Sequence, residues 1–295
     1  MFKGARKSVR NRVEKYSLAY LTTAPMQAPE MIQLARDVGF ETIGARLTST
    51  APNEPSALLE DASLQRATIS CIKATGVGIL DVEVLRIDPD FEVKEHKRLF
   101  EVAAMLGAAV VLAIGDDPDE LRLRDRFGEL CELAAPYHLD VQLEFMPWTA
   151  VPDARTALRI VSSIGKSNAK ILVDTLHVAR SQTTLDDLSA IPADMIKSVQ
   201  ICDGNNCGVM SPEAMMQSAR YGRLLPGEGD VDIPGILSRL PNGLRIGVEV
   251  PNSIRLAELG PKSWAERALV ASKLVVERVG QSIELHDDLN REGEK

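Results

Sequence analysis

Long apolar runs are missing from this sequence of 295 residues. No stretch approaches the roughly 20 consecutive apolar residues that a bilayer-spanning helix needs. The first 15 residues are basic, but the apolar segment that would complete a secretory signal does not follow them. The sequence therefore predicts a protein without a membrane span, and we expect it in the cytoplasm.

Cysteine is also scarce, and the chain carries only Cys71, Cys131, Cys202 and Cys207. These residues form no CxxC pair, and nothing in their spacing indicates the disulfide framework of a small secreted protein. We interpret them as ordinary thiols. A reducing compartment is the simplest environment for such a chain.

An excess of basic residues is lacking as well. The formal net charge is -8 and the isoelectric point is near 5.2, which disfavours a polyanion such as DNA as the main partner. No GxGxxG motif follows an early strand, so the main sign of an open dinucleotide-binding sheet is absent. A glycine-rich phosphate-binding turn is not evident either. We expect no nucleic-acid partner and a small-molecule substrate.

What the sequence does have is a repeated alternation of strand-like and helix-like segments. The expected strands are residues 17–21, 41–47, part of 76–87, 108–114, 140–145, 169–173, 196–202 and 244–250. Helical periodicity lies between them, at residues 29–38, 61–75, 92–106, 118–135, 152–164, 185–190, 212–219, 233–240 and 262–279. Such alternation implies parallel strands joined by helical crossovers, and eight units favour closure into a barrel.

We therefore expect a single-domain α/β protein, a (β/α)8 TIM barrel at residues 16–282. A basic N-terminal arm at residues 1–15 and an acidic C-terminal tail at residues 283–295 flank it. The connection after the seventh strand, residues 203–242, is far longer than an ordinary loop. A long insertion on the catalytic face of a barrel usually shapes or covers a site.

Oxygen-bearing side chains stand at the ends of the four later strands. Glu144, Asp174, Gln200 and Glu249 each follow or interrupt an apolar run. The carboxyl ends of barrel strands meet at one face, where active sites form. Buried carboxylates are unfavourable unless they are paired or bound to a cation, so the four positions indicate a site for Mg²⁺, Mn²⁺ or a similar ion. The alternative is that they are surface residues or members of structural ion pairs.

Five strings in this half of the chain resemble the sugar phosphate isomerase/epimerase family, also called the xylose isomerase-like barrel. They are LEFMPW at residues 143–148, ILVDTLHVAR at 171–180, VQICDG at 199–204, RLLPGEGDVDI at 223–233 and GVEVPN at 247–252. The ordered set is specific because each string falls at the expected strand, whereas PGEG alone would be weak. The resemblance covers nearly the whole barrel.

The resemblance implies one divalent metal ion and an acid/base pair. The family's metal ligands, a Glu, an Asp, usually a His and a second Glu, correspond to Glu144, Asp174, Gln200 and Glu249. Gln200 departs from the pattern, and an all-oxygen set favours Mn²⁺ or Mg²⁺, with Co²⁺ or Zn²⁺ as the other options. It also leaves open that Gln200 does not bind the metal. The two glutamates correspond to the residues that remove and return a proton beside a carbonyl.

The same resemblance implies substrate contacts for His177 and Arg223. The alternatives are a helix-start histidine for His177 and a loop ion pair, with Glu228 or Asp230, for Arg223. Residues expected to line the pocket from their strand-end positions are Arg46, Glu83, Arg86 and Trp148, the last with a packing role as an equal alternative.

The expected activity is isomerisation or epimerisation of a keto-sugar or related polyhydroxy carbonyl compound through an enediolate. A dehydratase acting on a keto-inositol or dehydroshikimate-like compound shares the first step and is the close alternative. A nuclease with several metals is disfavoured because the chain has only four histidines. A non-catalytic binding barrel is the remaining alternative. Family members are often homodimers or homotetramers, but no interface is evident here.

Overall fold

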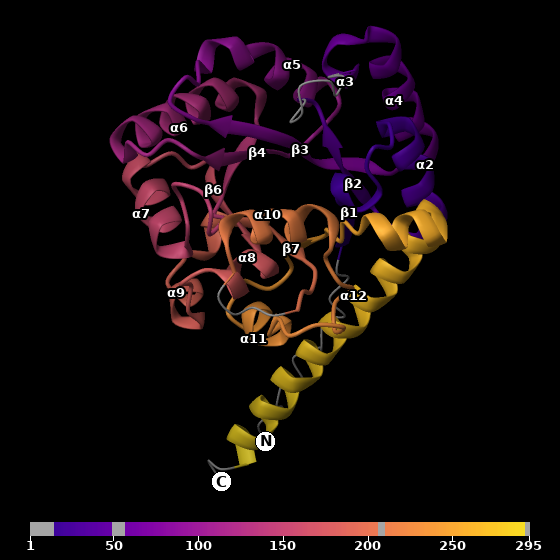
Figure 1. Cartoon of the computed structure of the whole chain (residues 1–295), viewed down its shortest axis with the longest axis vertical. Coiled ribbons are helices and arrows are strands. Elements are labelled where there is room, and N and C mark those ends of the chain that lie inside the picture. The colour runs from indigo at the N-terminus through magenta and orange to yellow at the C-terminus, as the bar shows by residue number, and fades with distance from the viewer. Residues whose placement is uncertain (1–14, 49–56, 206–209, 293–295) are drawn as a thin grey trace, which may run out of the picture.

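A closed barrel of eight parallel strands forms the centre of the protein (Figure 1). The computed structural model describes residues 15–48, 57–205 and 210–292, of which residue 57 and residues 279–292 are described by their backbone alone. β1 pairs with both β2 and β8, which closes the ring and confirms the (β/α)8 prediction. The strands are β1 Lys15–Leu18, β2 Thr42–Arg46, β3 Gly78–Ile87, β4 Val110–Gly115, β5 Asp140–Glu144, β6 Ala169–Asp174, β7 Ile196–Ile201 and β8 Arg245–Val248.

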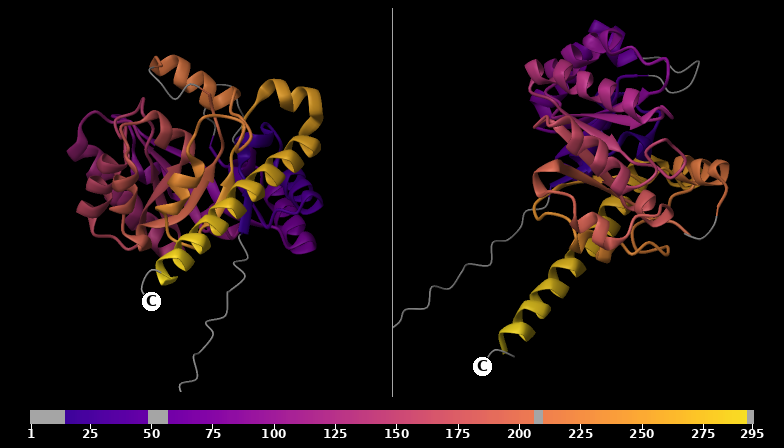
Figure 2. Two further views of the ribbon diagram at one scale, coloured as in Figure 1. Left: turned by 90° about the horizontal axis from the view of Figure 1, so that it is seen from below. Right: turned by 90° about the vertical axis from the view of Figure 1, so that its left-hand side faces the viewer.

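Helices surround the barrel, and the last one extends well beyond it (Figures 1 and 2). The α-helices are α1 Tyr20–Thr23, α2 Ala28–Val38, α3 Ala57–Glu60, α4 Ala62–Thr75, α5 Lys97–Met105, α6 Glu120–Ala134, α7 Ala154–Ile164, α8 Thr175–Arg180, α9 Leu185–Ser189, α10 Pro212–Tyr221, α11 Ile233–Ser238 and α12 Ser253–Glu292. Short 3-10 turns are η1 Val93–His96, η2 Ala135–Tyr137 and η3 Ala193–Met195. Within the described residues, no helix is both long and apolar enough to cross a bilayer.

The ends of several helices follow from side chains that the sequence places there. Asp119 caps α6 by accepting hydrogen bonds from the backbone N–H groups of Leu121 and Arg122. Gly39 ends α2 with a φ of 99°, a left-handed conformation that glycine adopts without strain. These local signals explain why most of the expected helices agree with the structure to within a few residues.

Some expected boundaries were wrong. β1 ends at Leu18, and residues 20–21, expected in that strand, belong to α1. α8 agrees with the helix start that was one interpretation of His177, although no helix range was predicted there. α12 is interrupted at Gly260, whose φ of 73° and ψ of 160° are not helical; the part after this break agrees with the helix expected from residue 262, whereas the part from Ser253 was not expected. The helix continues to Glu292, through most of residues 283–295, which were expected to form a tail. The predictions for residues 1–14, residues 293–295 and Cys207 concern positions outside the described part of the chain.

The apolar core lies mainly between the barrel and its helices, where Phe100, Phe127 and Trp264 are fully buried. Inside the barrel the apolar contribution is small, a separate cluster of Val110, Leu112 and Leu172. Alternate residues of a barrel strand point inward. The remaining inward positions of the later strands are largely polar, and they form the floor of the site described below.

Two threonines bind the ends of the last strands to the rest of the barrel. The Thr22 hydroxyl donates to the Val248 carbonyl at 2.9 Å and accepts from the Val250 N–H at 2.9 Å. Thr175 makes the same pair of bonds to the carbonyl and N–H of Cys202, at 2.8 and 3.0 Å. Thr22 thereby fixes the backbone on both sides of residue 249.

Replacing Thr22 by Val is expected to lower the free energy of unfolding by about 1–3 kcal/mol, because the buried Val250 N–H loses its acceptor while the side-chain shape is kept; the Val248 carbonyl still accepts from the Ala19 N–H. Urea denaturation measures the change. Ser189→Ala removes an exposed hydroxyl and is the control, with an expected change within about 0.5 kcal/mol. Equal stability of both variants would show that the Thr22 bonds contribute nothing.

Candidate functional site

The four oxygen-bearing residues of the later strands gather at the carboxyl end of the barrel. Glu144 ends β5, Asp174 ends β6, Gln200 lies in β7, and Glu249 directly follows β8. All four are buried. Asp174 pairs in register with Gln200, so neighbouring strands present them at the same level. The side chains are therefore close enough to act on one small molecule.

Asp174 has two roles at the start of α8. Its Oδ1 caps the helix by accepting from the Leu176 N–H at 2.7 Å and the His177 N–H at 3.4 Å. Its Oδ2 lies 2.6 Å from Arg223 Nη1. Burial opposes ionisation of this carboxyl, but Arg223, His177 and the capping bond together hold its pKa below the ordinary value. Asp174 is therefore a fixed carboxylate.

Arg223 bridges two of the acidic residues. Its Nη1 and Nη2 contact Asp174 Oδ2 at 2.6 Å and Glu249 Oε2 at 3.0 Å. The guanidinium also donates from Nε to the Ala219 carbonyl at 2.7 Å and from Nη1 to Cys202 Sγ at 3.2 Å. The sequence offered two interpretations of Arg223, a substrate contact and a loop ion pair with Glu228 or Asp230. The ion pair exists, but its partners are Asp174 and Glu249. The substrate contact stays a prediction.

The loop that carries Arg223 is organised around one buried carboxylate. Asp203 accepts from the backbone N–H groups of Gly204, Gly227 and Val231, at 2.8, 2.9 and 3.0 Å. A Cβ on Gly229 would lie 2.5 Å from Asp203 Oδ1 and 2.6 Å from the Gly204 carbonyl oxygen, so only glycine fits there. Glu228 of this loop pairs with Arg255 and not with Arg223.

Glu249 and Gln200 contact each other directly. Gln200 Nε2 donates to Glu249 Oε1 at 3.2 Å, while Gln200 Oε1 is buried and has no hydrogen-bond partner among the described residues. Burial raises the pKa of Glu249 well above its ordinary value, against the effect of Arg223; Glu83 and Asp174 add to the increase. The Glu249 carboxyl therefore holds a proton more readily than an exposed glutamate.

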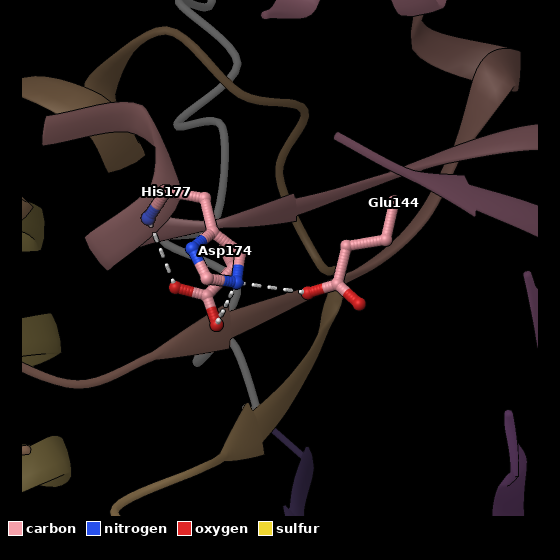
Figure 3. A group of neighbouring side chains, drawn as sticks. All are labelled: Glu144, Asp174 and His177. Atoms are coloured by element: carbon pink, nitrogen blue, oxygen red, sulfur yellow. Dashed lines mark hydrogen bonds and ion pairs between the residues drawn. The ribbon is translucent and has the colours of Figure 1, made fainter. Parts of the chain in front are cut away.

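The Glu144 carboxylate points toward the His177 ring (Figure 3). His177 Nε2 lies 3.4 Å from Glu144 Oε1 and 4.0 Å from Asp174 Oδ2. The ligand atoms of these three buried residues all lie within 4.8 Å of one another, a spacing that suits one metal ion. The ring of Trp148 packs edge-on against His177 with centroids 5.0 Å apart.

A second acidic pair lies on β3. Glu83 Oε2 contacts Arg46 Nη2 at 3.0 Å, and the Arg46 guanidinium stacks over the Tyr20 ring. Asp81, two residues earlier, was not singled out from the sequence, although a carboxylate within an apolar strand was the available sign. Burial and the neighbouring Glu83 raise its pKa well above the ordinary value. Arg46 and Glu83 thus lie together near the four oxygen-bearing residues of the later strands.

Arg86 lies at the outer edge of this region. It pairs with Asp116 at 2.6 Å, and both side chains are more than a third exposed.

The thiol of Cys202 is buried against Arg223, and burial raises its pKa to about 12. This is the inert thiol expected from the sequence.

Negative charge exceeds positive charge in this buried region. Glu249 is affected electrostatically by Glu83, Glu144 and Asp174, and Asp81 by Glu83 and Glu144. The guanidinium groups of Arg46 and Arg223 are the cations paired with these acids among the described residues. Protons or a bound cation must offset the remainder.

This excess of charge predicts that the metal-free protein loses stability as pH rises. The folded-state pKa values of Asp81 and Glu249 are raised, so the folded chain retains protons that the unfolded chain releases. The associated stability is present below about pH 4 and is lost as pH rises toward the raised pKa values, by at most about 1.4 kcal/mol per pH unit for each group. Urea denaturation in chelator between pH 5 and 8 is the measurement. Asp81→Asn should flatten the slope; a wild-type stability that increases over this range would contradict the charge assignment.

A family model described as the xylose isomerase-like TIM barrel matches residues 32–271. A search of curated proteins finds no match. Among solved structures, the IolI protein with a bound zinc atom is 20% identical, with a TM-score of 0.75 over 90% of this chain and 99% of IolI. The barrel found here is thus shared with proteins of very different sequence.

Two other solved structures carry named activities. The probable 3-DHS dehydratase AsbF of Bacillus anthracis is 18% identical, with a TM-score of 0.65 over 79% of this chain and 91% of AsbF. D-allulose 3-epimerase of Methylomonas sp., in complex with D-allulose, is 15% identical, with a TM-score of 0.66 over 88% of this chain and 96% of the epimerase. At these identities the likeness shows the fold alone.

Proposed function

Because the chain belongs to the xylose isomerase-like TIM barrel family, we propose that it is a divalent-metal-dependent isomerase or epimerase of a keto-sugar or related polyhydroxy carbonyl compound. One observation carries the proposal. Glu144 and Glu249 are buried carboxylates at one rim that have different partners, His177 for the first and Arg223 with Gln200 for the second. Two such groups suit removal of a proton and its return.

The two glutamates move the proton in this proposal. One takes a proton from the carbon beside the substrate carbonyl, and the other donates its own proton to the same or the neighbouring carbon. The raised pKa of Glu249 favours its protonated form, which suits the donating step. The enclosed position of both groups keeps water from competing for the proton.

The donor set suits a resident metal ion. Glu144 and Asp174 are its proposed anchors, and the resemblance implies Gln200 and Glu249 as the other two ligands, with Mn²⁺ or Mg²⁺ favoured. Gln200 Oε1, buried and without a partner among the described residues, is available to a cation. Such an ion supplies Lewis-acid polarisation of a carbonyl and stabilises an enediolate.

Substrate contacts are proposed for side chains that border these residues. Arg223 already contacts both Asp174 and Glu249, which places its guanidinium beside the proposed chemistry. The resemblance implies a similar contact for His177. Further proposed contacts are Arg46, Glu83, Arg86 and Trp148.

A metal-dependent dehydratase is the second candidate, and the likeness to the AsbF structure is the observation that favours it. The two reactions share removal of the proton beside the carbonyl. They differ afterwards, because a lyase expels a β-hydroxyl as water while an epimerase returns the proton. The residues of the rim serve either outcome.

Incubation in deuterated water separates the candidates. The Mn²⁺-loaded protein is mixed with D-allulose, D-tagatose, a keto-inositol or 3-dehydroshikimate, and products are examined by mass spectrometry and NMR. Gain of carbon-bound deuterium with the formula otherwise unchanged supports the isomerase or epimerase. Loss of water supports the dehydratase. Tight binding of one compound without either change would instead favour a non-catalytic binding barrel.

A further inference from the structure

The seventh strand lacks the imidazole that the family resemblance leads one to expect. Gln200 occupies that position, and its Nε2 donates to Glu249 Oε1 at 3.2 Å. The amide nitrogen, which cannot bind a metal, therefore faces the carboxylate that would be its fellow ligand. This hydrogen bond joins Gln200 to Glu249 directly, while Gln200 Oε1 has no hydrogen-bond partner among the described residues.

A guanidinium already occupies the space between Asp174 and Glu249. Arg223 contacts one oxygen of each carboxylate, at 2.6 and 3.0 Å. Bonds to Ala219 and Cys202 hold the same side chain in place, and it is 3% exposed. A divalent ion directly between Asp174 and Glu249 would need the space that this guanidinium fills.

Glu144 and His177 bring two further donors to the same Asp174 oxygen, Oδ2, that Arg223 contacts. His177 Nε2 lies 3.4 Å from Glu144 Oε1 and 4.0 Å from Asp174 Oδ2, and the three side chains converge in Figure 3. Two ligands of one ion, each about 2.0–2.2 Å from it, lie at most about 4.4 Å apart. Both distances from the imidazole satisfy this limit, and the three ligand atoms all lie within 4.8 Å of one another.

The backbone holds this arrangement. Asp174 caps α8 and His177 lies three positions later, so both side chains project from the same face of the first turn. The bond from the His177 backbone N–H to Asp174 Oδ1 holds the backbone of this residue, and Trp148 packs edge-on against its ring, whose Nδ1 has no hydrogen-bond partner among the described residues. A nitrogen ligand supplied in this way needs no movement of the barrel strands.

From this geometry we infer that Glu144, Asp174 and His177 hold the divalent ion, and that Arg223 takes the place of a metal between Asp174 and Glu249. The inference rests on the proposed metal dependence. It replaces the substrate contact that the resemblance implies for His177, and it frees Glu249 and Gln200 from the metal. A nitrogen ligand also shifts the preference from Mg²⁺ toward Mn²⁺, Co²⁺ or Zn²⁺.

Pulsed electron paramagnetic resonance of the Mn²⁺-loaded full chain tests the inference without any assay of activity. Electron spin echo modulation from a ligating ¹⁴N nucleus is expected in the wild type. It should disappear in His177→Asn, whose Mn²⁺ affinity, measured by titration calorimetry, should fall at least about tenfold. His138→Asn is the matched control, since His138 is exposed and has a φ of 57° that Asn tolerates.

Two more variants separate this assignment from the ligand set implied by the resemblance. Gln200→Ala and Glu249→Gln should each keep the ¹⁴N modulation and bind Mn²⁺ within about threefold of the wild type. Two outcomes would overturn the ligand assignment but leave the proposed metal dependence intact. One is Mn²⁺ that binds the wild type without ¹⁴N modulation. The other is Mn²⁺ affinity that is lost in these two variants but kept in His177→Asn. A wild-type protein that binds no divalent ion would overturn the proposed metal dependence with it. The wild-type spectrum decides the question even if His177→Asn does not fold.

Discussion

Replacing Glu249 by Gln is expected to slow deuterium incorporation into the substrate by about 10²–10⁴-fold, the range typical for loss of a general acid or base. The amide keeps the size of the side chain and its contact with Gln200, but it cannot exchange a proton with a carbon atom. The effect should fall on kcat more than on KM, because the lost interaction belongs to the proton-transfer step. Mass spectrometry of the substrate in deuterated water measures the rate.

The comparison for this variant is Glu266→Gln, which makes the same change at an exposed position of α12. Its exchange rate should equal that of the wild type. Metal content of Glu249→Gln is measured in parallel, so that loss of the acid/base group is distinguished from loss of the ion. A Glu249→Gln protein that exchanges deuterium at the wild-type rate would remove Glu249 from the proposed mechanism.

Replacing Arg223 by Met is expected to lower the free energy of unfolding by about 3–5 kcal/mol. The substitution leaves Asp174 and Glu249 buried without the cation that lies between them. Because both carboxyls then favour protonation, the loss should grow as pH rises from 5 to 8. Urea denaturation of the metal-free protein at several pH values is the measurement.

Arg159→Met provides the matched comparison. Arg159 pairs with Glu120 at 2.6 Å, as close as Arg223 is to Asp174, but both side chains are at least half exposed. An exposed pair of this kind contributes about 0–1 kcal/mol, so the change should be small and independent of pH. Equal losses in the two variants would show that burial of the Arg223 pair has no energetic consequence.

The barrel could be predicted because the sequence signals that define its strands and helices are local. Apolar strand segments, helical periodicity and capping residues such as Asp119 act over a few positions. Eight repeats then leave few ways to arrange parallel strands. The range of the short helix α8 was not predicted, because its first turn depends on Asp174, which was considered as a metal ligand and not as a cap.

The partners within the site could not be predicted in the same way. Arg223 and Asp174 are 49 positions apart, and no pattern of spacing joins them. The pairing depends on the path of the long loop, which in turn depends on three backbone bonds to Asp203. Resemblance supplied the candidate residues, whereas the guanidinium between Asp174 and Glu249 emerged only from the three-dimensional arrangement.

The contrast between the outer core and the barrel interior has a consequence for variation. Phe100, Phe127 and Trp264 hold the fold together from outside, while the inward positions carry hydrogen-bonded groups such as Ser198, whose hydroxyl donates to Gln142 at 3.0 Å. We therefore expect paired polar exchanges among inward positions to leave the packing between strands and helices intact.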